Sequence, residues 1–299
     1  MLKQLGYNLV GSLSVICYFI NTVFWFVPIM CFSVLKLLPI PPWQRGISYL
    51  LDGCATNWIT VNRQNQNIFS RTNIDVQGVE QLSPQDWYLV IANHQSWVDI
   101  LVLQRIFNRR IPFLKFFLKR ELIWVPFLGL AWWALDFPFM RRYSKSFLAK
   151  NPHLKGKDLE TTRKACEKFS TKPVSVMNFI EGSRFTARKH QRQQPPFEHL
   201  LKPRAGGIAF VLSAMGEQLH KLVNVTIHYP KGIPTFWDFV CGKVNDITVR
   251  VDVTPISDLF DQQIFNQRYF DDPQQRAKFQ QWLNALWFEK DQQLNELKQ

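Results

Sequence analysis

The sequence predicts an α/β fold in which a mostly parallel central sheet is flanked by helices and preceded by an N-terminal membrane-embedded helical segment. Two observations predict it. From residue 73 onward, short apolar runs rich in β-branched residues alternate with helical segments, which is typical of parallel sheets. Before that region, residues 9–35 form a run of 27 residues without a charged side chain.

The N-terminal run is long enough to cross a bilayer, whose hydrocarbon core is about 30 Å thick. Asn21 and Pro28 interrupt the run, so a bent span and a re-entrant pair of short helices both remain open, beside the alternative of a buried core helix. Basic residues follow the run, while Lys3 is alone before it. This bias predicts that the C-terminal bulk of the chain lies on the cytoplasmic side of the membrane.

The remaining elements are expected in the following order. Residues 46–72 are rich in Asn and Gln and predict a polar connector. Strands are predicted at 73–79, 87–92, 112–117, 174–180, 222–228 and 247–253, with helices at 97–107, 122–135, 158–169 and 206–215. From residue 257 the chain is polar and helical, with Phe260, Phe265, Trp282, Leu286 and Trp287 as anchors. We therefore expect an anchor at 1–45, a connector at 46–72, a catalytic domain at 73–255 and a C-terminal extension at 256–299.

The net charge of +13 and the pI of about 9.6 predict anionic partners. Aromatic residues make up 14% of the chain and favour a membrane interface, and without a recognition motif nucleic acid is not an expected partner. The five cysteines are scattered and lack metal-ligand spacing, so we expect reduced thiols, no metal and no cofactor.

His94 and Asp99 form the first candidate catalytic element. His94 follows an apolar strand and precedes a helix, where a general base can reach substrate. If the Asp99 carboxylate holds one imidazole N–H, the other ring nitrogen is free to take a proton. Because Ser96-x-x-Asp99 is also a capping-box pattern, Asp99 can cap the helix as well. The sequence offers no nucleophile elbow and no cysteine placed as a nucleophile, which favours direct acyl transfer to a substrate hydroxyl.

A second element, Glu181-Gly182-Ser183-Arg184, follows another apolar strand. Arg184 can clamp a phosphate, Gly182 allows close approach of the backbone, and Glu181 can bond a substrate hydroxyl or orient Arg184. An ordinary strand-ending turn with a surface ion pair is the alternative. The basic stretch from Phe185 to Arg204 is either a solvated loop or a docking patch for a phosphate or a carrier protein.

These two elements, with Leu118-Lys119-Arg120-Glu121-Leu122 between them, resemble the lysophospholipid acyltransferase family in its bacterial membrane-bound form. The reference activity of that family is 1-acylglycerol-3-phosphate acyltransferase. The resemblance implies that His94 is the base, that Asp99 is its partner, and that Glu181, Gly182, Ser183 and Arg184 bind the glycerol phosphate of the acceptor. It also implies phosphate contacts from Lys119 and from Arg141 or Arg142. Ile180 and Ser183 replace the usual proline and threonine, and both changes preserve the chemistry.

The resulting hypothesis is a membrane-bound acyltransferase that moves a fatty acyl group from acyl-CoA or acyl-ACP to a lysophospholipid. Backbone amides near the His94 loop or Gly182 are the expected donors to the developing oxyanion. Two alternatives stay open: a thioesterase or lysolipase that activates water with the same pair, and a membrane-anchored lipid-binding or regulatory protein.

Overall fold

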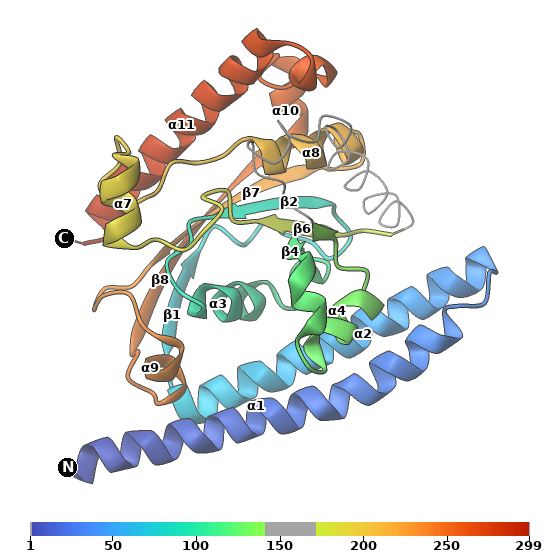
Figure 1. The fold of residues 1–299 in the computed structure, drawn as a ribbon, viewed down its shortest axis with the longest axis vertical. Helices are drawn as coiled ribbons and strands as arrows, with labels where there is room; N and C mark the ends of the chain where they lie inside the picture. Colours follow the sequence, from blue (N-terminus) through green and yellow to red (C-terminus); the bar gives the residue numbers. More distant parts are fainter. Residues whose placement is uncertain (1, 141–171, 299) are drawn as a thin grey trace.

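The computed structural model describes residues 2–140 and 172–298, and these form a mixed α/β fold built on one large sheet (Figure 1). The sheet order is β1-β8-β7-β2-β6-β3. Its strands are β1 (Asn73–Gln77), β2 (Tyr88–Ala92), β3 (Leu114–Phe116), β6 (Ser175–Asn178), β7 (Lys221–His228) and β8 (Asp246–Pro255). Every pairing in this sheet is parallel except β7 with β8, so the predicted fold class is confirmed.

Helices cover both faces of the sheet (Figure 1). On one face lie α3 (Val98–Phe107), α2 (Pro41–Asn65) and α1 (Leu2–Leu35), and on the other lie α8 (Gly206–Met215), α10 (Ile256–Asp261) and α11 (Pro273–Glu296). The strands β2 and β6 are buried throughout because both of their faces are covered. Alternate residues of β2 therefore enter two separate cores, with Val90 on the α3 side and Leu89 on the α8 side.

Helix α1 presents apolar side chains outward, and most of its fully buried residues are small or polar. Its buried residues are Gly11, Ser14, Asn21, Ile29 and Ser33, whereas its exposed residues include Leu13, Ile20, Phe24 and Val27. Asn21 donates to the carbonyl of Trp58 at 3.0 Å and to the side chain of Asn62 at 2.8 Å, both in α2. Small and polar residues at a helix contact, with apolar residues outside, are typical of helices that meet lipid. By length and composition α1 can cross a membrane, and it is one continuous helix with Pro28 inside it rather than a re-entrant pair.

Most of the predicted polar connector at residues 46–72 is helical, since it belongs to α2 and to the π-helix Gln66–Ser70. Ile47, Leu51, Ala55 and Ile59 recur at every fourth position and are buried along one face of α2. Of the Asn and Gln residues that suggested a connector, Asn62 and Asn65 are buried near the C-terminal end of α2, where they bond the side chains of Asn21 and Ser14 in α1.

The predicted apolar helix at 122–135 is divided into a 3₁₀ helix, η2 (Arg120–Trp124), and a short α-helix, α4 (Leu128–Ala134). Pro126 lies between them, and Phe127 has a φ of 59°. The backbone of Ile123 passes so close to Gly129 that a Cβ there would lie 2.0 Å from the Ile123 carbonyl oxygen. The two strands beside this unit, β4 (Leu118–Lys119) and β5 (Phe139–Met140), pair with each other. The predicted helix at 158–169 lies outside the described residues.

The C-terminal helices pack into the core. Phe265 and Trp287 are buried, and Phe260, Trp282 and Leu286 pack against the same cluster, which confirms all five as anchors. Two smaller helices are α7 (Ala187–Gln193) and α9 (Phe236–Val240), and a 3₁₀ helix spans Gln267–Phe270.

Candidate active site

The two sequence elements meet at one edge of the sheet because they follow neighbouring parallel strands. His94 comes just after β2, and Glu181 to Arg184 come just after β6, with Ile91 and Asn178 as register partners. The amide of Phe185 donates to the carbonyl oxygen of His94 at 2.7 Å and joins the two loops. The carboxyl ends of parallel strands are the usual position of sites in α/β folds.

His94 and Asp99 are paired as expected. Nδ1 of His94 lies 2.8 Å from Oδ2 of Asp99, and the Asp99 side chain is fully buried. Oδ2 also accepts hydrogen bonds from the backbone amides of Gln95 at 2.6 Å and Ser96 at 2.9 Å. Asp99 therefore holds the imidazole and the start of α3 at once. Phe179 stacks on the imidazole, with ring centroids 3.9 Å apart, and so fixes the plane of the ring.

Tyr229 is a further partner that the sequence did not reveal. Its hydroxyl donates to Oδ1 of Asp99 at 2.5 Å. Burial, followed by the neighbouring Asp99 charge, raises the pKa of Tyr229 well above its ordinary value, so the hydroxyl remains a donor. Tyr229 follows β7, far along the chain from His94, and no local pattern connects the two.

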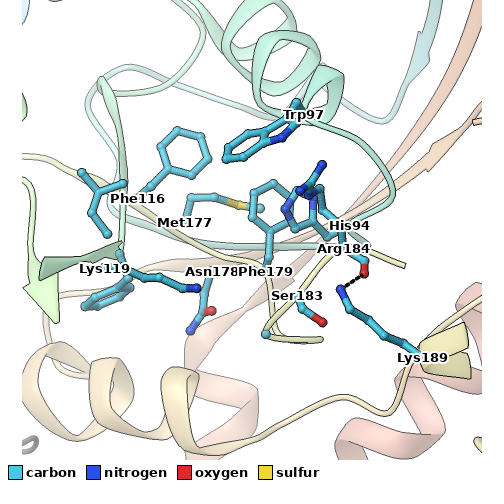
Figure 2. Close-up of a pocket in the computed structure, with 13 residues that line it drawn as sticks. His94, Trp97, Phe116, Lys119, Met177, Asn178, Phe179, Ser183, Arg184 and Lys189 are labelled. Atoms are coloured by element: carbon cyan, nitrogen blue, oxygen red, sulfur yellow. Dashed lines mark hydrogen bonds between the residues drawn. The ribbon is translucent and has the colours of Figure 1, made fainter. Parts of the chain in front are cut away.

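A cleft of about 320 Å³ opens beside His94 (Figure 2). Its lining combines aromatic and apolar side chains with a few polar ones, as is usual for ligand pockets. The lining residues are His94, Trp97, Phe116, Phe117, Leu118, Lys119, Met177, Asn178, Phe179, Gly182, Ser183, Arg184 and Lys189.

Four predicted binding residues line this cleft: Lys119, Gly182, Ser183 and Arg184. Lys119 and Arg184 lie on opposite sides of it (Figure 2). The guanidinium of Arg184 lies 4.6 Å from the ring centre of Trp97, and Lys189 donates to the Arg184 carbonyl oxygen at 2.8 Å. Gly182 has a φ of 72°, a left-handed conformation that favours glycine. Arg141 and Arg142 lie outside the described residues.

Glu181 does not take the position expected for a substrate ligand. Its side chain is fully buried, and its two oxygens accept from the backbone amides of His94 at 3.0 Å and Leu201 at 3.1 Å. Burial raises the pKa of Glu181 to about 8. The Glu181 carboxyl group therefore binds the backbone of the His94 loop without lining the cleft. It positions that loop and does not contact substrate.

The expected oxyanion donors are also occupied. The amides of His94, Gln95 and Ser96 donate to the two buried carboxyl groups. The amide of Gly182 donates to the carbonyl of Phe179 at 2.9 Å. These four amides are therefore already engaged and are not free to stabilise a developing negative charge.

The basic stretch after Arg184 contains α7 and is fastened to the C-terminal helix. Both oxygens of Asp291 accept backbone amides at 2.8 Å, from Glu198 and His199. The next residue toward the N-terminus, Lys290, is buried and donates to the carbonyl of Val225 at 2.5 Å. Helix α11 thus holds the segment that follows the site, and a docking role for its basic side chains stays a prediction.

Within residues 2–140 and 172–298, no group of three or more His, Cys, Asp or Glu side chains is placed to hold a metal ion. That no metal or cofactor takes part stays a prediction from the sequence.

Fold and site together define an α/β protein that carries a histidine–aspartate pair beside a cationic cleft. A family model described as acyltransferase matches residues 73–228, which is more than half of the chain. The chain belongs to the acyltransferase family.

Curated relatives are similar over most of the chain. Mouse 1-acyl-sn-glycerol-3-phosphate acyltransferase delta is 24% identical over 216 residues, 68% of this chain and 51% of the relative. Chicken lysocardiolipin acyltransferase 1 is 24% identical over 286 residues, 90% of this chain and 66% of the relative. The chain spans about half the length of the first of these.

The crystal structure of the 1-acyl-sn-glycerophosphate acyltransferase PlsC from Thermotoga maritima has a similar fold. Its TM-score is 0.56 at 15% sequence identity, and the match covers 99% of this chain and 98% of that one.

Proposed function

We propose that this protein is a membrane-bound O-acyltransferase that moves a fatty acyl group from an acyl thioester to the free hydroxyl of a lysophospholipid such as 1-acylglycerol-3-phosphate. The donor is the thioester of coenzyme A or of acyl carrier protein. The names of the relatives support this choice, since they act on acylglycerol phosphates or lysocardiolipin.

One observation carries the proposal: the 2.8 Å contact between His94 and Asp99 lies beside a cleft that also holds Lys119 and Arg184. The pair supplies a base and the two cations supply sites for a phosphate. Phe116, Met177 and Phe179 give the cleft an apolar wall suited to an acyl chain.

The reaction moves one proton from the acceptor hydroxyl to His94 and then from His94 to the leaving thiolate. Nε2 of His94 accepts the proton of the acceptor hydroxyl while that oxygen attacks the thioester carbonyl carbon. The carbon–sulfur bond of the tetrahedral intermediate then breaks, and His94 returns the proton to the leaving thiolate. Asp99 stabilises the transient imidazolium and keeps Nδ1 as the donor toward itself.

The outward apolar face of α1 supports attachment to a membrane. Exposed apolar side chains of the η2–α4 unit, Trp124, Leu130 and Trp133, extend this face, since α4 packs against α1. Aromatic rings of this kind favour the bilayer interface. We place the enzyme at the cytoplasmic side of an inner membrane, where both the lipid acceptor and a soluble donor are available.

The test uses purified protein, a labelled acyl donor and excess 1-acylglycerol-3-phosphate. The wild type should form diacylglycerol phosphate, and His94→Ala should keep its melting temperature while losing about 10²- to 10⁴-fold in rate. Free fatty acid in the presence of excess acceptor would instead favour a hydrolase. Lipid binding without turnover across many donors would favour a regulatory protein.

A further inference from the structure

Asn178 is a polar side chain in the cleft that neither short sequence motif contains. It is the last residue of β6, and only 6% of its surface is exposed. Within the described part of the chain its side-chain amide makes no hydrogen bond, although it lines the cleft. The amide is not fully enclosed, so the partner that it lacks among the described residues is supplied from the cleft, by water or by a polar group of a ligand.

The neighbouring helix leaves room for this amide. A Cβ placed on Gly207, in the first turn of α8, would lie 2.3 Å from Nδ2 of Asn178. Gly206, beside it, has open space around the equivalent position and does not line the cleft. The absence of a side chain at residue 207 is therefore what allows Asn178 to keep its position.

The surroundings of Asn178 are electropositive and are separated from the reacting atoms. Figure 2 shows its amide below Phe179, between Lys119 and Ser183, while His94 lies beyond the Phe179 ring. Consecutive residues of a strand point to opposite faces, which explains why Phe179 meets the imidazole and Asn178 meets α8. The N-terminal end of the ten-residue helix α8 adds a positive field to the charge of Lys119.

We infer that Asn178, with Lys119, forms a subsite that binds a phosphate oxygen of the acceptor head group, and this inference rests on the proposed function. An amide N–H and an ammonium group can both donate to an anionic oxygen, whereas an apolar acyl chain has no acceptor for either. Asn178 then determines specificity for the phosphorylated acceptor without taking part in proton transfer.

The experiment measures equilibrium binding, without donor, of 1-oleoylglycerol 3-phosphate and of uncharged monooleoylglycerol in detergent micelles. The replacement Asn178→Leu has a similar shape without the polar atoms. We expect it to weaken binding of the phosphorylated lipid about tenfold or more and to leave monooleoylglycerol binding unchanged. Its melting temperature should stay the same or rise, because an unpartnered buried polar group is removed.

Gly207→Ala should weaken phosphate binding in the same way, since its methyl group displaces the amide, while Gly206→Ala should not. The double variant with Asn178→Leu and Gly207→Ala should bind like Asn178→Leu alone, because both changes act through one group.

Equal affinity of Asn178→Leu and the wild type for the phosphorylated lipid would overturn the inference while leaving the proposed function intact. An equal loss of affinity for both lipids, or a lowered melting temperature as the main effect, would show that Asn178 has a structural role. Either result would also overturn the inference. A wild type that binds neither lipid would overturn the proposed function and the inference together.

Discussion

Replacement of Asp99 by asparagine tests the chemistry of the site most directly. The carboxylate accepts four hydrogen bonds: from Tyr229 at 2.5 Å, from the amides of Gln95 and Ser96 at 2.6 and 2.9 Å, and from His94 at 2.8 Å. Asparagine keeps one acceptor oxygen at almost the same volume, so the imidazole can remain in place. The negative charge that stabilises a protonated His94 is lost.

The expected effect on rate exceeds the effect on stability. In Ser-His-Asp triads the same replacement lowers kcat about 10⁴-fold, which corresponds to about 5.5 kcal/mol of transition-state stabilisation. We expect a loss of about 10³-fold or more for Asp99→Asn, since the pair here has the same contact. Weakened hydrogen bonds to a charged acceptor should cost about 2–3 kcal/mol of folding free energy.

The assay follows release of free thiol from the acyl donor at saturating acceptor, at a temperature well below the melting point of each variant. Two variants serve as controls: His94→Ala alone, and the double variant that carries both His94→Ala and Asp99→Asn. Their rates should be equal, because the two residues are expected to act as one unit. An Asp99→Asn enzyme with kcat within about tenfold of wild type would refute the role assigned to the pair.

Three further predictions concern the supports of the site. Tyr229→Phe removes the 2.5 Å hydrogen bond to Asp99 and should lower kcat about tenfold with little change in acceptor KM; an unchanged kcat in steady-state assays would contradict this. Because burial raises the pKa of Glu181, its protonated form stabilises the fold below pH 4.5, and this contribution is lost as the pH rises toward about 8. Over that range the melting temperature of the wild type should fall relative to Glu181→Gln, and parallel curves would exclude the effect. Asp291→Ala leaves the backbone amides of Glu198 and His199 without their acceptor and should lower the melting temperature. Glu289→Ala, on the exposed side of the same helix, should not. Equal shifts in melting temperature would show that these two hydrogen bonds do not stabilise the fold.

The sequence predicted the parts of the site that depend on local spacing. His94 and Asp99 are five positions apart at a strand end, and this spacing is sufficient to bring them into contact once α3 begins. The residues themselves indicated that Arg184 can bind a phosphate, while Lys119 entered only through the family resemblance, and both line the same cleft. Their roles in binding substrate stay predictions.

Groups that come together only through the tertiary fold were not predictable. Tyr229 reaches Asp99 from the end of β7, and Lys290 reaches the same strand from α11. Glu181 was expected to bond a substrate hydroxyl or to orient Arg184, but side chains beside a tight turn can point inward or outward. This one points inward, where the Leu201 amide donates to it. The helix within residues 46–72 was not predicted, because the polar composition of this segment drew attention away from the apolar residues at every fourth position.

The outward apolar face of α1 has a practical consequence for solution studies. Phe24 is 65% exposed and Ile20 is 60% exposed, while the inner side of the helix is already fastened to α2 by the Asn21 amide. In water without any amphiphile, two copies can shield these faces only by associating with each other. A dimer or larger aggregate seen under such conditions would therefore report missing lipid, and it should dissociate as detergent is titrated past its critical micelle concentration.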